Sequence, residues 1–334
     1  MRRVVVILGA GASVSAGLPS LAGVFEDESV KAYLASDGRD FEIFLKKYIW
    51  GPRNVTEAER RRSLNLEEVL TLLRLWEDNN QSPLNFKKNR NYQRQLLGCV
   101  YRSVYMDKRD NGARDYNHLI IHCDRSYDSV TWASFNWDAK FEQAFYYALL
   151  SLGQGNNLPR CHPGVKGWEG TNPKHLLLKL HGSVSWLEGP KTGTAQSLRF
   201  GAVKGARPIE KAWDAYLAGG PNALSPIIAE PSFFKHERIK KSKFLWSQWN
   251  TFDKALGQAD DVLIIGYSLP DGDAMAKQSL LTLVARNPNA KVIVVDPDGD
   301  GQVLSRYIRV VGGPPRLSAR RETLSDFIAR LDVR

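Results

Sequence analysis

The chain has 334 residues, of which 43% are hydrophobic and 25% are charged, and its formal net charge is +10. This is the composition of an ordinary soluble globular protein, with room for one large α/β domain or two smaller ones and for an ample core. No apolar run approaches the roughly 20 residues that cross a bilayer, so a membrane-spanning segment is not expected.

The start of the chain, "MRRVVVILGAGAS", has a basic beginning and an apolar run that is too short for a secretory signal. It is better interpreted as a first strand that runs into a glycine loop. Three cysteines, Cys99, Cys123 and Cys161, lie far apart and form no C-x-x-C pair. Such spacing suits a reducing cytoplasm, which is the expected location, and excludes a four-cysteine zinc ribbon. No metal is expected.

The basic residues are scattered through "ERRRS", "FKKNRNYQR", "ERIKKSK" and "SARRE", mostly without interleaved aromatic residues. This pattern favours a solvated basic surface over a dedicated DNA groove. Contact with nucleic acid, an acidic partner or an anionic ligand stays open, because net charge does not choose among them.

Short β-branched runs alternate with helical stretches, which predicts an α/β fold with a Rossmann-like, doubly wound and mostly parallel sheet. The expected strands are 4–8, 129–135, 176–180, 225–230, 261–266 and 291–296. The expected helices are 65–78, with Asn65 as N-cap, 137–150, 243–259 and 273–288. About 100 residues separate the first glycine loop from the second strand, too many for a simple crossover. We therefore expect a large helical insertion at 26–125 within a single domain, 1–334.

The first strand is followed directly by Gly9 and Gly11, and Ser13 and Gly17 come shortly after. Glycines at this place allow backbone N–H groups to approach a pyrophosphate. The fingerprint G-x-G-x-x-G fails at its last position, where valine stands, and a tight turn needs glycine with or without a ligand. The serine and the following G-L-P turn favour phosphate binding.

Two further strand ends carry polar residues. Asn136 and Asp138 follow the second strand, and His181 and Gly182 follow the apolar run "LLLKL". Ligands bind outside the carboxyl ends of strands in such sheets, so these groups should converge on one crevice with the glycine loop. Asn136 could orient a sugar hydroxyl or a water, and His181 could act as a general base. Asp138 and Asn136 could also serve as helix caps.

At the other side of the sheet, "DVLIIGYSLPDGDAMA" places Gly266 and Ser268 after a hydrophobic strand, and Asp273 is expected to cap the next helix. Asp296 ends "KVIVVD" and is placed to bind the ribose diol of an adenosine. A simple turn before the following proline explains Asp296 equally well.

In this order, the motifs G-A-G-A-S, G-L-P, F-N-W-D, L-H-G and G-Y-S-L-P resemble the sirtuin family, and more closely the divergent sirtuin-like proteins of bacterial antiphage defence. The match runs from residue 4 to about 300. The family binds NAD on a Rossmann-like sheet. The resemblance implies that Asn136 and His181 lie at the nicotinamide ribose, and that the other candidate residues bind the rest of NAD. Those candidates are Gly9, Ala10, Gly11, Ser13, Gly17, Asp138, Gly266, Ser268 and Asp296.

The departures from deacylating sirtuins bear on the reaction. The zinc ribbon of those sirtuins is missing here. Their G-I-P-D-F-R is replaced by G-L-P-S-L-A, and their Q-N-I-D is replaced by S-F-N-W-D. The defence-type relatives share these losses and hydrolyse NAD. The resemblance thus implies an NAD glycohydrolase, with NAD as substrate, that acts as a regulated toxic effector. It implies control by self-assembly into a homo-oligomer or by a separate activator, such as a hexameric DNA-translocating ATPase.

Two alternatives remain. The first is a non-catalytic subunit that senses NAD or ADP-ribose within a larger complex, which would have no use for Asn136 and His181 together. The second, less favoured, is a protein deacylase or ADP-ribosyltransferase, which the missing zinc ribbon disfavours.

Overall fold

The structure is a computed structural model that describes residues 1–14, 16–49, 56, 58–59, 61, 64–78, 84–105, 113–153, 159–161, 170–189, 195–197, 209–230, 232 and 234–331. Two compact units can be separated. Unit 1 comprises residues 1–17, 109–183 and 239–334, and unit 2 comprises residues 18–108 and 184–238. The predicted insertion, 26–125, therefore includes residues of both units.

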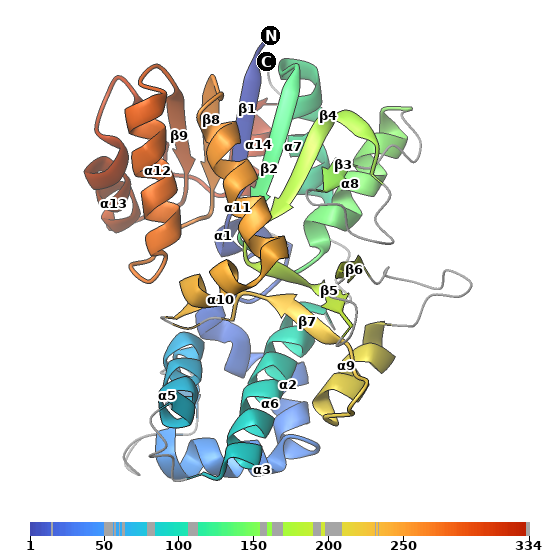
Figure 1. Cartoon of the computed structure of the whole chain (residues 1–334). Coiled ribbons are helices and arrows are strands. Elements are labelled where there is room, and N and C mark those ends of the chain that lie inside the picture. Colours follow the sequence, from blue (N-terminus) through green and yellow to red (C-terminus); the bar gives the residue numbers. More distant parts are fainter. Residues whose placement is uncertain are drawn as a thin grey trace. The chain divides into compact units, whose positions relative to one another are not determined.

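Unit 1 contains a seven-stranded sheet in which every neighbouring pair is parallel. From one edge to the other the strands are β10 (Leu317–Arg320), β9 (Lys291–Val295), β8 (Asp261–Ile265), β1 (Arg3–Leu8), β2 (Ser129–Ser134), β4 (Asn172–Lys179) and β3 (Pro159–Cys161). Without the edge strand β3, this is the strand order 3-2-1-4-5-6 of dinucleotide-binding sheets. The predicted Rossmann-like fold is confirmed (Figure 1).

Helices cover both faces of this sheet (Figure 1). One face packs against α7 (Ala113–Ser126), α8 (Lys140–Ser151) and α14 (Leu324–Leu331), whereas α11 (Lys243–Leu256) and α12 (Ala274–Arg286) lie on the other. The unit also contains α1 (Ala10–Val14) and α13 (Gln302–Val311).

The central strand β1 shows why continuous apolar runs in the sequence predict the strands of this sheet. Val4, Val6 and Leu8 belong to the same buried cluster as Tyr116 of α7 and Phe145 of α8. The intervening residues of the strand are also buried, because alternate side chains point to opposite faces and both faces are covered. A parallel strand buried on both faces reads as a continuous hydrophobic run.

Unit 2 is mainly helical. Its helical segments are η1 (Leu21–Glu26), α2 (Glu28–Ala35), α3 (Arg39–Phe44), η2 (Leu45–Ile49), α5 (Leu66–Asp78), α6 (Phe86–Tyr105) and α9 (Ile209–Leu217), and α10 (Lys235–Lys241) runs across its boundary. A three-stranded sheet has the order β6 (Ala195–Ser197), β5 (Gly182–Glu188) and β7 (Ser225–Ile228). The predicted N-cap of α5 is confirmed, since Asn65 Oδ1 accepts the Glu67 N–H at 2.9 Å.

The other predicted helices are present as α8, α11 and α12. The assignment of 225–230 to the parallel sheet was wrong, because β7 belongs to the three-stranded sheet of unit 2. Its apolar run is short, and a buried strand shows the same run in either sheet. Strands β3, β5, β6 and β10 were not predicted.

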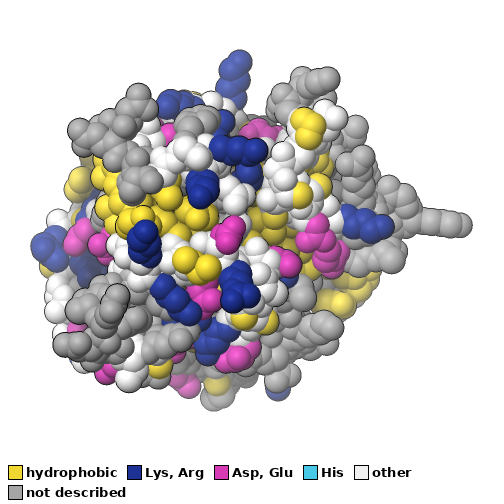
Figure 2. Space-filling view, turned by 90° about the horizontal axis from the view of Figure 1, so that it is seen from below, with side chains coloured by type: hydrophobic (Ala, Val, Ile, Leu, Met, Phe, Trp, Pro, Cys, Tyr) yellow, Lys and Arg dark blue, Asp and Glu magenta, His cyan; other side chains and the backbone are white. Residues whose placement is uncertain are grey.

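Figure 2 shows the face of the molecule on the side of α3. Hydrophobic side chains gather on this face, and both basic and acidic side chains surround them. In unit 2 the exposed hydrophobic residues include Ile43, Tyr48 and Leu75. Within the described residues, no helix is long and apolar enough to cross a membrane.

Candidate functional site

Two glycine loops meet at the carboxyl ends of β1 and β8. The Gly9 N–H donates to the Ile265 carbonyl at 3.0 Å, and the Gly11 N–H donates to the Gly266 carbonyl at 2.8 Å. A Cβ on Gly9 would lie 2.5 Å from Gly266 O, and a Cβ on Gly266, whose φ is +59°, would lie 2.2 Å from Ala12 N. The glycines are therefore required for backbone contact within the protein.

This contact changes how the glycine loop can bind a ligand. The N–H groups of Gly9 and Gly11, which were predicted to bind phosphate, donate instead to the last residue of β8 and to the first residue after it. Ala10 and Gly11 are nevertheless exposed. The outer surface of the loop is thus presented to solvent while its inner surface is held by the neighbouring loop.

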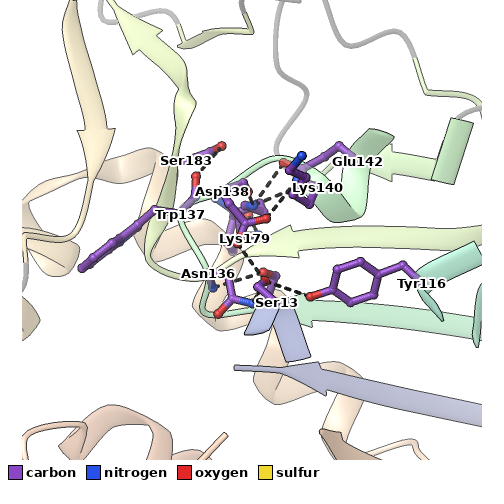
Figure 3. A network of polar contacts seen from close by, with 11 residues as sticks. Ser13, Tyr116, Asn136, Trp137, Asp138, Lys140, Glu142, Lys179 and Ser183 are labelled. Carbon is purple, nitrogen blue, oxygen red and sulfur yellow. Dashed lines mark hydrogen bonds and ion pairs between the residues drawn. The ribbon is translucent and has the colours of Figure 1, made fainter. Parts of the chain in front are cut away.

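Asn136 ties the end of β2 to the glycine loop (Figure 3). Its Nδ2 donates to the Gly9 carbonyl at 2.8 Å and to Ser13 Oγ at 2.9 Å, and the residue is only 8% exposed. A primary amide has two N–H donors, so both are used within the protein. Its carbonyl oxygen is the atom of Asn136 suited to accept a hydrogen bond from a ligand.

Ser13 is the centre of this cluster (Figure 3). Its Oγ donates to Asp138 Oδ2 at 2.9 Å and lies 2.9 Å from Tyr116 OH. A hydroxyl has one donor and two acceptor positions, so Ser13 fits when Tyr116 and Asn136 both donate to it. Asp138 Oδ1 accepts the Lys140 N–H at 2.9 Å, at the first turn of α8. Asp138 therefore supports the helix start, as the sequence allowed, and also the cluster.

A buried ion pair lies beside the cluster, and the sequence analysis missed it. Lys179 is fully buried, and its Nζ lies 3.1 Å from Glu142 Oε1 and also donates to the Asp138 carbonyl. Burial raises the pKa of Glu142, and the nearby ammonium opposes that shift. The signal was present, because Lys179 is the one charge in "LLLKL" and a buried charge must be paired.

His181 lies just past β4, beside the end of β2. Its ring meets the Phe135 ring edge-on, with the centroids 4.9 Å apart, and the residue is 7% exposed. Its Nε2 is 3.7 Å from Asp273 Oδ1, and the Tyr267 hydroxyl donates to the other oxygen of that carboxylate at 2.6 Å. Asp273 occupies the N-cap position of α12, as predicted, but its side chain makes no capping hydrogen bond.

Helix α11 holds the strand end that carries His181. Gln248 Oε1 accepts the Lys179 N–H at 2.7 Å, and Trp249 Nε1 donates to the Leu180 carbonyl at 3.0 Å. The amide of Gln248 takes the place of a neighbouring strand at this point, since the described pairing of β3 with β4 ends at Leu177. The Leu180 N–H also donates to the Ser134 carbonyl at 2.9 Å, so the backbone just before His181 is held by β2 and by α11.

The remaining candidates lie apart from this cluster. Gly17 has a φ of +80°, as a turn glycine requires. Ser268 is exposed after β8, and its carbonyl accepts a hydrogen bond from Arg306 at 3.1 Å. Asp296 is half-buried at the end of β9, accepts the Asp298 N–H at 3.1 Å, and has a pKa raised by burial. Within the described part of the chain, no group of three or more His, Cys, Asp or Glu side chains could hold a metal ion.

Comparison with known proteins finds no matching family model and no matching curated protein. Solved structures do match over nearly the whole chain. One is Sir2 in complex with the inhibitor EX-527, 2'-O-acetyl-ADP-ribose and deacetylated p53 peptide, with 13% identity, a TM-score of 0.44, and coverage of 99% of this chain and 92% of that chain.

A second is a Sir2 homolog–NAD complex, with 12% identity, a TM-score of 0.46, and coverage of 98% of this chain and 87% of the other. A third addresses the mechanism and regulation of Sir2 enzymes, with 12% identity, a TM-score of 0.47, and coverage of 99% and 91%. All three TM-scores are below 0.5.

The contact between the glycine loops predicts a sensitive position at Gly266. Replacement by alanine should lower the free energy of unfolding by more than about 1–3 kcal/mol, because the left-handed backbone alone costs that much and the overlap with Ala12 N adds to it. Gly313→Ala is the control, since an added Cβ there meets nothing within 4 Å. Equal urea denaturation curves for the two variants would contradict the contact.

The buried ion pair predicts a strongly non-additive result. Lys179→Met should cost about 3–5 kcal/mol because it leaves Glu142 buried without its cation. The double variant Lys179→Met/Glu142→Leu should be more stable than that single variant. Lys277→Met, which removes an exposed pair with Asp271, should cost at most about 1 kcal/mol. Urea unfolding of these variants and of the single variant Glu142→Leu measures the effect. A double variant as unstable as the sum of its two single variants would refute the pairing.

Proposed function

We propose that the chain is an NAD glycohydrolase whose site lies at the carboxyl edge of the parallel sheet. The observation that carries this proposal is the strand order, which reverses between β1 and β8 where the two glycine loops meet. In sheets of this kind the dinucleotide binds outside the strand ends at that reversal. The adjoining strand ends carry Asn136 and His181.

The candidate residues suit successive parts of NAD along this edge. The exposed surface of Ala10 and Gly11 is available to the pyrophosphate, and Ser268 and Asp296 follow β8 and β9 on the side proposed for the adenosine. Asn136 and His181 follow β2 and β4 on the opposite side of β1, which we assign to the nicotinamide ribose.

The proposed reaction breaks the bond between C1' of the ribose and the nicotinamide nitrogen. Nicotinamide leaves as a neutral molecule with the bonding electron pair, and the ribose passes through an oxocarbenium-like state. A water oxygen then bonds to C1'. The Asn136 carbonyl oxygen accepts a hydrogen bond from this water, and His181 accepts the proton that the water loses. The products are nicotinamide and ADP-ribose, and no metal is required.

The cluster around Ser13 supports this assignment because it fixes Asn136 in advance. Both N–H groups of the amide are already held, so the orientation of the carbonyl oxygen is set before a ligand arrives. Preorganised polar groups contribute to catalysis since they need no rearrangement during the reaction.

The resemblance of the motifs to defence-type relatives also supports a proposal about the role of the protein in the cell. An NAD-hydrolysing protein depletes its host's NAD, so we infer a restrained effector of antiphage defence. Restraint and activation would come from assembly with further copies of the chain or from a separate activator, for which a hexameric DNA-translocating ATPase is the candidate partner.

A second candidate is a non-catalytic module that senses NAD or ADP-ribose. The observation that favours it is that both N–H donors of Asn136 are used within the protein. A rigid surface of this kind can bind a ligand without taking part in a reaction. The two candidates differ in one observable, which is turnover.

The proposal predicts release of nicotinamide and ADP-ribose when the purified protein is incubated with NAD and the mixture is followed by chromatography. Asn136→Ala and His181→Ala should each lower kcat by about 100-fold or more, the usual contribution of a preorganised polar group for Asn136 and of a positioned general base for His181. His236→Ala is the matched control because that histidine is exposed on α10, and it should retain full activity.

The assay is repeated with candidate activators and DNA if the isolated chain is inactive. Binding of ADP-ribose without turnover under all of these conditions would favour the sensing module. Turnover that survives both substitutions would show that the reaction takes place elsewhere.

A further inference from the structure

A carboxylate that the sequence analysis assigned to helix capping faces the proposed catalytic histidine. Asp273 is 5% exposed, and its Oδ1 lies 3.7 Å from Nε2 of His181, which is 7% exposed. Two buried ionisable groups at this separation influence each other strongly, since neither is screened by bulk water.

The carboxylate is aimed at the histidine by its own partners. The Tyr267 hydroxyl donates to Asp273 Oδ2 at 2.6 Å, which leaves Oδ1 on the side of His181. Tyr267 is itself fixed, because its ring stacks on Phe135 at 4.1 Å and its carbonyl accepts the Tyr307 hydroxyl at 2.6 Å. Each member of the chain from Tyr267 to His181 is thus held in place by a further contact.

The backbone between Tyr267 and Asp273 supports a built arrangement. Leu269 is fully buried and has a φ of +50°, a conformation that residues other than glycine adopt rarely and at a cost. The turn that it forms lies between Tyr267 and Asp273. Strain of this kind persists where the surrounding structure requires it, and it gathers at functional sites.

Among the described side chains, Asp273 is an ionic neighbour of His181, and several other groups around the ring bring no charge to it. Phe135, which follows β2, and Trp249 of α11 lie beside the ring and carry no charge. Tyr267, which follows β8, turns its hydroxyl to Asp273. Lys179, the last residue of β4, lies two positions before His181, but its ammonium is bound to the Asp138 carbonyl and Glu142.

We propose that Asp273, oriented by Tyr267, is the positioning residue of His181. It fixes the ring orientation, keeps the N–H on Nε2, assigns the accepting role to Nδ1, and stabilises the imidazolium once a proton has been taken up. The pairing itself stands on geometry alone, and its catalytic consequence rests on the proposed NAD cleavage.

The direct test is an NMR titration of the histidine ring signals in the intact protein. The His181 signal is assigned as the one missing from His181→Gln. In Asp273→Asn its titration midpoint should move to lower pH, because the carboxylate that favours the charged ring is gone. Asp271→Asn is the matched control on the same loop, since Asp271 is exposed and paired with Lys277, and it should leave the midpoint unchanged. An unchanged midpoint in Asp273→Asn would overturn the proposal.

A measurement on the unaltered protein keeps the proposal testable if Asp273→Asn does not fold. The ring ¹⁵N shifts of neutral His181 should report the tautomer with hydrogen on Nε2. A neutral ring protonated on Nδ1 would contradict the proposal.

The catalytic consequence is measured separately. If the protein cleaves NAD, Asp273→Asn should lower kcat by roughly 10-fold or more with a smaller change in KM, and the acid limb of the pH–rate profile should move to lower pH. A shifted NMR midpoint without any NAD cleavage would leave the pair intact and refute the proposed function. Full activity with an unshifted profile would refute the positioning role.

Discussion

The structure depends on one close contact, in which the backbone after β1 meets the backbone after β8. These two strands are neighbours at the point where the strand order reverses, and a side chain on Gly9 or Gly266 would overlap the opposite backbone. The hydrogen bond from Gly11 to Gly266 closes the contact. Everything proposed for the ligand site is arranged around this junction, since Ser13 and Asn136 are attached to one of its loops and Tyr267 and Asp273 follow the other.

Much of unit 1 could be predicted from the sequence because strands of a parallel sheet that is buried on both faces have a recognisable apolar pattern. Strands β1, β8 and β9 each contain an uninterrupted apolar run, and glycine or polar residues appear where these strands end. The same rule failed for β7, since a strand of four residues, three of them buried, has no feature that tells one sheet from another. The division into two units involves contacts between 18–108 and 184–238, which are distant in sequence.

Site residues could be predicted from the sequence where the residue type is unusual for its position. Residues of a type that is common at their position could not be recognised. Asn136 and His181 stand out because each interrupts an apolar stretch at a strand end. Lys179 is equally unusual, but only the nearby His181 was predicted as a site residue. The partner of Lys179, Glu142, has no feature in the sequence that distinguishes it from other glutamates in helices. Asp273 was assigned to the helix cap, which its position in the chain supports, and only the three-dimensional contacts with Tyr267 and His181 show another role.

The central claim is that a dinucleotide binds where β1 and β8 separate the two halves of the sheet. The most direct measurement is a crystal structure of His181→Ala grown with NAD, a variant chosen so that the ligand is not consumed. We expect the pyrophosphate against Ala10 and Gly11, the adenosine toward Asp296, and the nicotinamide ribose beside Asn136. NAD bound at any other place, or no bound NAD at millimolar concentration, would contradict it.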